Sequence, residues 1–248
     1  MTDFAHVWSD LPWWGWTLAV VAALLFGFSK TAIGNLALAG VVILAALTPA
    51  KDSTGAALLL LLVGDLVASW VYRKSVDWRL LGRLVVPVVA GLALGAWFLS
   101  LVSDLVLKRT IGVVLLVLLL LGRWADRLAA RTGSIAYGYG ALAGFTTMTA
   151  NAGGPAMSLY LLAARFDKLR FLGTNAWFFF AVNAAKVPVS VGLGIIRPEV
   201  CAFAAALAPA VLVGTWLGRV AVKRMDQKLF ERLVTLFVAL SALYLVFG

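Results

Sequence analysis

A short pattern of small, aromatic and polar residues occurs twice in this chain. Gly27-Phe28-Ser29-Lys30 recurs as Gly144-Phe145-Thr146-Thr147, 117 positions later. Further matches keep the same order at offsets of 118 to 123: Gly55 with Gly173, Asp65 with Asn183, Pro87 with Pro209, Gly91 with Gly214 and Gly95 with Gly218. The nearly constant offset predicts an internal duplication, with a first copy at 1–122, a linker at 123–133 and a second copy at 134–248.

Six apolar stretches are long enough to cross a membrane, whose hydrocarbon core of about 30 Å needs about 20 helical residues. They run at 54–72, 84–102, 105–121, 171–191, 199–220 and 229–247. The composition agrees, because 63% of the residues are hydrophobic and only 13% are charged, whereas soluble domains carry about 25% charged residues. The sequence therefore predicts an all-α protein that crosses the membrane several times.

Two other apolar regions, 12–48 and 134–164, are too long for one simple span. Each is interrupted near its middle by small and polar residues, GFSKTAIGN at 27–35 and GFTTMTANAGGP at 144–155. Gly and Pro at such a break permit close backbone approach and a helix restart. We interpret each region as a broken or re-entrant helical hairpin.

The distribution of Lys and Arg supports the hairpins, because short cytoplasmic loops are enriched in these residues. With hairpins, fifteen Lys and Arg residues fall in cytoplasmic loops and four fall in loops on the outer side. If each region instead crossed the membrane once, the better of the two orientations would place eleven of these residues on one side and eight on the other. Each copy then holds one hairpin and three transmembrane helices, so the second copy is inverted relative to the first. We expect a bacterial inner-membrane protein with both termini on the periplasmic side.

The two breaks supply candidate substrate-binding residues. Lys30 lies deep in apolar sequence, where a charge is costly and indicates function by default. The other candidates at the breaks are Ser29, Thr31, Asn35, Thr147, Thr149, Asn151, Gly153 and Gly154. Two alternatives remain open: the hydroxyl and glycine residues only pack helices together, or Lys30 reaches a membrane surface along its flexible stem.

A polar stripe lies on the predicted helix 171–191. Asn175, Asn183, Lys186 and Ser190 fall on one helical face, while Phe178 and other apolar residues occupy the remaining faces. A polar face with a lysine should meet protein or water rather than lipid. Asn175, Asn183 and Lys186 are therefore candidate substrate-binding residues, although the asparagines could instead bond to a neighbouring helix.

Asp65 is the acidic residue in the middle of a predicted span, and the duplication matches it with Asn183. It could neutralise Lys30 or Lys186, or it could take up a proton during transport. We slightly favour the ion pair. Two lysines and one carboxylate give a net positive site, which suits a small anion.

The two breaks, and above all the segment 143–194, resemble the TauE/SafE family of sulfite exporters and related permeases. The likeness rests on the Gly-Gly-Pro break at 153–155, on Gly-Thr-Asn at 173–175 and on the Asn-x-x-Lys-x-Pro element that begins at Asn183. In the first copy, Gly34-Asn35-Leu36 stands where many members have consecutive glycines. The resemblance implies a secondary transporter for a small sulfur-containing anion such as sulfite, thiosulfate or an organosulfonate.

An enzyme is not expected. The single histidine, His6, lies in the N-terminal tail, so a membrane serine protease would lack its base. An aspartyl protease would lack a second buried acid. No zinc motif, P-loop or dinucleotide fingerprint occurs, and Cys201 is the single cysteine, so we expect neither a cofactor nor a metal.

The expected partners are the sulfur-containing anion and the lipid bilayer, and no nucleic acid. A coupling proton and a homo-oligomer are left open by the sequence. An anion channel of the same fold is the alternative to a carrier that works by alternating access around a midplane site, because both need a positive site in the membrane.

Overall fold

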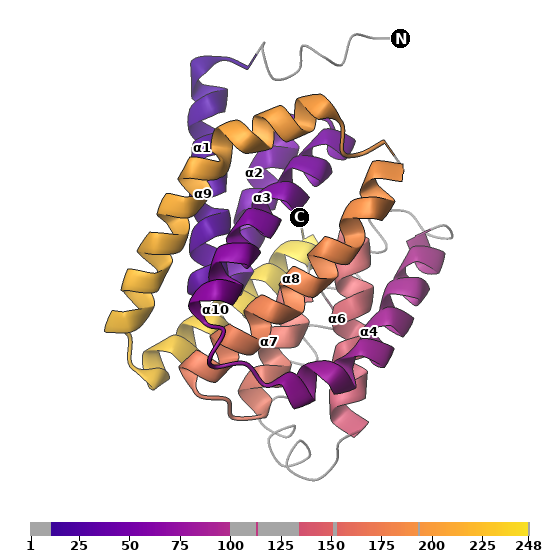
Figure 1. Cartoon of the computed structure of the whole chain (residues 1–248), viewed down its shortest axis with the longest axis vertical. Coiled ribbons are helices and arrows are strands. Elements are labelled where there is room, and N and C mark those ends of the chain that lie inside the picture. Colours follow the sequence, from indigo (N-terminus) through magenta and orange to yellow (C-terminus); the bar gives the residue numbers. More distant parts are fainter. Residues whose placement is uncertain (1–10, 100–112, 114–133, 151–152, 193, 248) are drawn as a thin grey trace. The chain divides into compact units, whose positions relative to one another are not determined.

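A computed structural model describes residues 11–99, 113, 134–150, 153–192 and 194–247. Within these residues every regular element is a helix (Figure 1), which confirms the predicted all-α class. The predicted span 105–121 falls outside the described residues except at position 113.

The helices within the predicted first copy are α1 (Trp13–Thr31), the short 3-10 helix η2 (Gly34–Leu36), α2 (Ala37–Leu47), α3 (Ala50–Val71) and α4 (Trp78–Leu99). Those of the second copy are α6 (Ser134–Ala150), α7 (Gly153–Ala163), α8 (Lys168–Gly192), α9 (Pro198–Arg224) and α10 (Gln227–Phe247). Among the described helices, four are long and apolar enough to cross a membrane: α1, α3, α4 and α9. In α8 the polar stripe lowers the mean hydropathy.

Several helices begin before the apolar stretches that predict them, because polar residues form their first turns. The carboxylates of Asp77, Asp167 and Asp226 accept hydrogen bonds from backbone N–H groups at the starts of α4, α8 and α10. Such capping satisfies donors that have no partner within the helix. A hydropathy pattern counts only the apolar part and so misses this turn.

Both interrupted regions fold back as hairpins. A Cβ atom added at Gly40 in α2 would lie 2.8 Å from Phe26 Cε1 and 3.1 Å from the Ala22 carbonyl oxygen of α1. A Cβ atom at Gly153, the first residue of α7, would lie 2.8 Å from Thr147 Cβ of α6. The second helix of each region therefore runs back along the first.

The described chain forms two compact units, and each unit mixes both copies. Unit one contains 1–73 and 176–224, and unit two contains 74–175 and 225–248. In unit one α1 of the first copy packs against α9 of the second, and in unit two α6 of the second copy packs against α4 of the first. Each hairpin thus packs on a helix from the other copy.

The duplicated glycines make matching contacts in the two units. A Cβ atom at Gly27 would lie 2.0 Å from the Val211 carbonyl oxygen, and one at Gly144 would lie 2.3 Å from that of Val88. Val88 and Val211 are themselves 123 positions apart, the offset of the matched glycines Gly91 and Gly214. Glycine is therefore required at both places because helix backbones touch there. That the copies are inverted stays a prediction.

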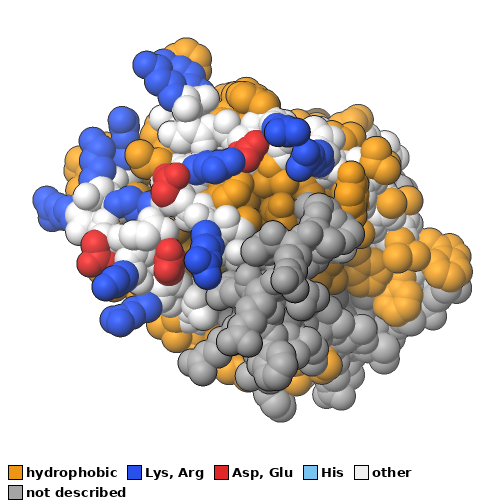
Figure 2. Space-filling model, turned by 90° about the horizontal axis from the view of Figure 1, so that it is seen from below, with side chains coloured by type: hydrophobic (Ala, Val, Ile, Leu, Met, Phe, Trp, Pro, Cys, Tyr) orange, Lys and Arg blue, Asp and Glu red, His pale blue; other side chains and the backbone are white. Residues whose placement is uncertain are grey.

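The surface of the described residues is rich in large apolar side chains. Trp13, Val86 and Trp70 are 80%, 74% and 68% exposed. Figure 2 shows apolar side chains beside clusters of Lys and Arg. Apolar exposure on this scale would be unfavourable in water, and it is the surface that a lipid-covered protein presents.

Candidate functional site

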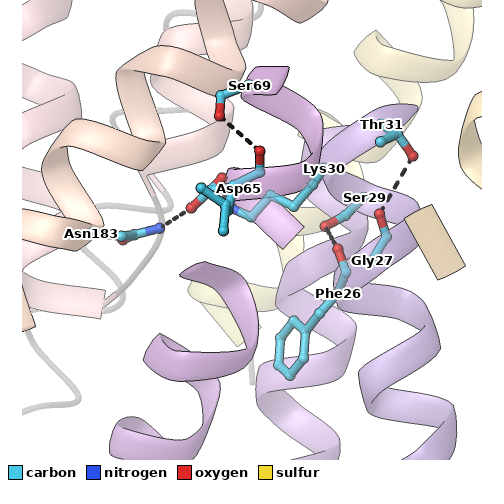
Figure 3. Close-up of polar contacts among 9 residues, drawn as sticks. Phe26, Gly27, Ser29, Lys30, Thr31, Asp65, Ser69 and Asn183 are labelled. Atoms are coloured by element: carbon cyan, nitrogen blue, oxygen red, sulfur yellow. Dashed lines mark hydrogen bonds and ion pairs between the residues drawn. The ribbon is translucent and has the colours of Figure 1, made fainter. Parts of the chain in front are cut away.

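Lys30 lies in the last turn of α1 and forms an ion pair inside unit one. Its Nζ atom is 2.7 Å from Oδ1 of Asp65 on α3, and the two side chains are 9% and 0% exposed. The carbonyl end of α1 also favours a cation at this position. The close-up in Figure 3 shows the Lys30 side chain directed at Asp65.

Gly64 makes room for the stem of Lys30. A Cβ atom at Gly64 would lie 2.9 Å from Lys30 Cγ, closer than carbon atoms normally approach. Gly64 precedes Asp65 on α3, so the same turn of helix accommodates the lysine stem and supplies its counter-charge.

The second oxygen of Asp65 accepts a hydrogen bond from Asn183 on α8. The distance from Asn183 Nδ2 to Asp65 Oδ2 is 2.6 Å. Asp65 and Asn183 occupy matching positions in the two copies, and both are buried. The carboxylate is thus held by a cation from one side and an amide from the other, which a buried charge requires.

Lys186 follows Asn183 by one turn of α8, and Lys30 is close enough for the two positive charges to repel. Lys30 Nζ also lies 5.0 Å from the centre of the Phe179 ring, a distance at which an aromatic face attracts a cation. We call Lys30, Asp65, Asn183 and Lys186 the buried cluster. With its lysines charged and Asp65 ionised, this cluster carries a net positive charge.

The hydroxyl groups beside Lys30 donate hydrogen bonds to backbone carbonyls. Ser29 Oγ donates to the Phe26 carbonyl of its own helix at 2.7 Å, and Thr31 Oγ1 donates to the Thr215 carbonyl of α9 at 2.7 Å. A hydroxyl has a single hydrogen to donate. In this arrangement Ser29 bonds within α1 and Thr31 links α1 to α9, and the contact of either residue with a substrate stays a prediction.

Asn35 lies in η2, at the break of the first hairpin. Its side chain is buried, with the residue 4% exposed, and neither its amide nitrogen nor its amide oxygen has a hydrogen-bond partner in the described structure. A buried polar group without a partner costs about 1–3 kcal/mol. Such a group is a strong candidate for binding a polar ligand.

The candidate residues of the second hairpin lie in unit two. Thr147 is 2% exposed and packs against Gly153, while Gly154 is partly buried. Asn175 is 7% exposed, and its amide oxygen has no partner in the described structure. Asn151 and the side chain of Thr149 lie outside the described residues. The structure therefore places the buried cluster in unit one and Thr147, Gly153, Gly154 and Asn175 in unit two.

Sequence reasoning missed two ion pairs at helix starts. In unit one Arg197 Nη2 lies 2.5 Å from Asp52 Oδ1, and in unit two Arg170 Nη2 lies 2.5 Å from Asp77 Oδ2. Asp52 and Arg170 are 118 positions apart, and Asp77 and Arg197 are 120 apart. The signal was therefore present as opposite charges at matching positions of the two copies.

Asp77 lies in the connection between α3 and α4, outside the membrane-spanning segments. Partial burial raises the pKa of its carboxyl, but hydrogen bonds from the Leu80 N–H and from Arg170, together with the Arg170 charge, outweigh burial and lower that pKa below its ordinary value. The Asp77 N–H also donates to Thr174 Oγ1 at 3.0 Å. These contacts fix the start of α4 against the start of α8.

Comparison with known proteins identifies the family of the chain. A search of curated proteins and a search of solved structures found no match to the chain. A family model described as "Sulfite exporter TauE/SafE" matches residues 19–245, which include both hairpins and all four residues of the buried cluster. The chain therefore belongs to the sulfite exporter TauE/SafE family and is a multi-pass membrane protein of a transporter family.

Proposed function

We propose that this protein is a secondary transporter of the bacterial inner membrane for a small sulfur-containing anion, such as sulfite, thiosulfate or an organosulfonate. The observation that carries the proposal is the buried cluster. Two lysines and one carboxylate lie together on helices of a membrane protein, where charges are costly and persist when function needs them. The family match supports the sulfur-containing substrate class.

In the proposed binding mode, the anion lies beside Lys30 and Lys186. Without substrate, Asp65 neutralises Lys30, and the remaining positive charge of the cluster attracts an anion. The amides of Asn35 and Asn183 add neutral donors, and Asn35 has an amide group with no partner in the described residues. Ammonium and amide donors suit the oxygen atoms of a small oxyanion.

We further propose that residues of the second hairpin also bind the anion. The start of α7 at Gly153 and Gly154 presents backbone N–H groups that have no partner within the helix, and helix starts favour anions. Thr147, Thr149, Asn151 and Asn175 are the side chains that would assist. Transport would follow alternating access, in which two inverted copies open the site first to one side of the membrane and then to the other.

Flux of labelled sulfite into vesicles containing the purified protein tests the proposal. We expect saturable uptake that is accelerated by unlabelled sulfite on the opposite side, and a loss of at least tenfold in Lys30→Ala and Lys186→Ala. Lys223→Ala, which removes an exposed lysine at the end of α9, is the matched control and should transport normally. Flux that rises linearly with concentration would instead identify an anion channel. Normal uptake by both cluster variants would refute the site.

A further inference from the structure

Asn35 brings an unsatisfied amide group into the interior of unit one. The residue is 4% exposed, and neither Nδ2 nor Oδ1 has a hydrogen-bond partner in the described structure. An asparagine side chain in a turn commonly bonds to the nearby backbone. Here the turn is closed without the side chain, because the Leu36 N–H donates to the Ile33 carbonyl at 3.0 Å. The amide group of Asn35 therefore takes no part in closing this turn.

The position of Asn35 suits an anionic ligand. Asn35 lies in η2, which contacts α1, and it follows Lys30 by five residues. It also lies directly before Leu36, the N-cap of α2, and no side chain of the described residues caps that helix start. A helix start carries partial positive charge and favours an anion. In the sequence, the amide group is thus placed between a lysine and an uncapped helix start.

The two ends of the Asn35 amide need opposite partners. Nδ2 has two hydrogens to donate, whereas Oδ1 can only accept. The oxygen atoms of a sulfur oxyanion satisfy Nδ2, but they repel Oδ1 because both carry negative charge. Thiosulfate and simple alkanesulfonates have no N–H or O–H group at neutral pH, so they leave Oδ1 buried without a partner, which is unfavourable. An anion that also carries a hydroxyl group satisfies both ends.

We infer that Asn35 selects sulfur oxyanions that also carry a hydrogen-bond donor, such as bisulfite or a hydroxyalkanesulfonate, over those that carry none. This inference rests on the proposed function and narrows its substrate class. One oxygen of the anion accepts a hydrogen bond from Asn35 Nδ2, while the O–H group of the same anion donates to Asn35 Oδ1. The charge attraction of Lys30 is equal for anions of equal charge, so the preference comes from the amide.

Two sulfonates that differ by one hydroxyl group, isethionate (hydroxyethanesulfonate) and ethanesulfonate, test the inference. Both are monoanions over the whole working range of pH, so their charge is matched. The dissociation constant of each is measured with the purified full chain, from the dependence of its thermal stability on ligand concentration. For the wild-type protein we expect isethionate to bind about tenfold more tightly or better, because a site that hydrogen-bonds a hydroxyl group rejects the analogue that lacks it.

In Asn35→Leu, which keeps the branched shape and removes both polar atoms, the preference should disappear or reverse, because the hydroxyl group then loses water without gaining a partner. Asn35→Ala is the second variant, in case the leucine side chain is too large. Thr48→Val is the matched control on the same hairpin. Thr48 follows α2, is 8% exposed, and has a hydroxyl group that donates to the Leu44 carbonyl at 2.9 Å. This control should keep the preference for isethionate.

Each of four results would overturn the inference: equal affinity for the two sulfonates in the wild type, tighter binding of ethanesulfonate, binding of neither sulfonate, or a preference that persists in both Asn35 variants. The comparison in the wild type decides the question even if neither variant folds. Flux of labelled sulfite, measured with the same preparation, separates the inference from the proposed function. If that flux is saturable, only the inference fails, and if sulfite does not cross the vesicle membrane, both fail.

Discussion

At the scale of single residues, Lys30 and Asp65 depend on each other for stability. Both are buried, and their charged atoms are 2.7 Å apart. Removing one member of a buried pair leaves an uncompensated charge and costs about 3–5 kcal/mol, whereas replacing both members is often close to neutral. The pair should therefore show strong coupling between substitutions.

We predict that Lys30→Met lowers the free energy of unfolding by about 3–5 kcal/mol, and that adding Asp65→Asn restores most of the loss. Lys30→Arg should retain little function, since a wide guanidinium does not replace a compact ammonium. Denaturation of the purified protein in detergent measures the stability of the single and double variants, and flux into vesicles measures the function of Lys30→Arg. Additive losses in the double variant would show that the two side chains act independently.

The sequence identified the members of the buried cluster because a charge within an apolar stretch is visible without a structure. It could not decide the partner of Asp65, since Lys30 and Lys186 were both available and the choice depends on helix packing. Gly64 escaped notice for a similar reason. Its role is to leave space for a side chain of α1, which is a property of the contact and not of the local pattern.

At the scale of helices, the duplicated glycines define the closest contacts. Gly27 and Gly144 each lie against a backbone carbonyl of the other copy, whereas Gly82 in α4 has nothing within 4 Å of an added Cβ atom. A methyl group at either of the first two positions must force helices apart. At Gly82 it meets open space.

We predict that Gly27→Ala and Gly144→Ala each destabilise the protein by about 1–3 kcal/mol or more, because overpacking displaces backbone. Gly82→Ala should leave stability unchanged or raise it by up to about 1 kcal/mol through helix propensity. Thermal denaturation of the three variants in one detergent compares them. Equal stability of all three would contradict the close helix contacts.

The two ion pairs at the helix starts occupy matching positions but differ in exposure. The side chains of Asp52 and Arg197 are 3% and 34% exposed, and those of Asp77 and Arg170 are 16% and 51% exposed. Solvent screening weakens an exposed pair to about 0–1 kcal/mol. The pair in unit one should therefore matter more for stability than the pair in unit two.

We predict that Asp52→Ala costs about 3 kcal/mol, by the cost of breaking a buried pair, and that Arg170→Ala costs about 1 kcal/mol or less. The pKa of Asp77 is lowered in the folded protein, so its contribution is present above the ordinary aspartate pKa and is lost as the pH falls through the folded value. The cost of Arg170→Ala should accordingly shrink in acid. A larger cost for Arg170→Ala than for Asp52→Ala would contradict this ranking.

At the scale of the whole molecule, the helical class and the two hairpins were readable from hydropathy, while the duplication that the repeated residues indicate stays a prediction. The sequence did not show that each hairpin packs on a helix from the other copy. The contacts of α1 with α9 and of α4 with α6 join segments far apart in the chain. The hydropathy of a single helix does not specify its partner. The matched glycines gave the positions of these contacts but not their partners.

The predicted sidedness can be measured by cysteine labelling in a Cys201→Ser background. Lys74→Cys lies in the connection between α3 and α4, and Glu199→Cys lies at the start of α9. In intact cells a membrane-impermeant maleimide should label Glu199→Cys and not Lys74→Cys, because the positive loops face the cytoplasm. The reverse pattern would invert the orientation, and labelling at both positions would contradict the topology.

The central claim is that the buried cluster binds a small sulfur oxyanion. Its most direct test is the thermal stability of the purified protein with sulfite, thiosulfate, sulfate, methanesulfonate, acetate and chloride, beside Lys30→Ala, Lys186→Ala and the Lys223→Ala control. A ligand that binds only the folded state raises its apparent stability. We predict selective stabilisation by a sulfur oxyanion that is lost in both cluster variants and kept in the control. Indifference to every anion, or stabilisation that survives in both cluster variants, would contradict the claim.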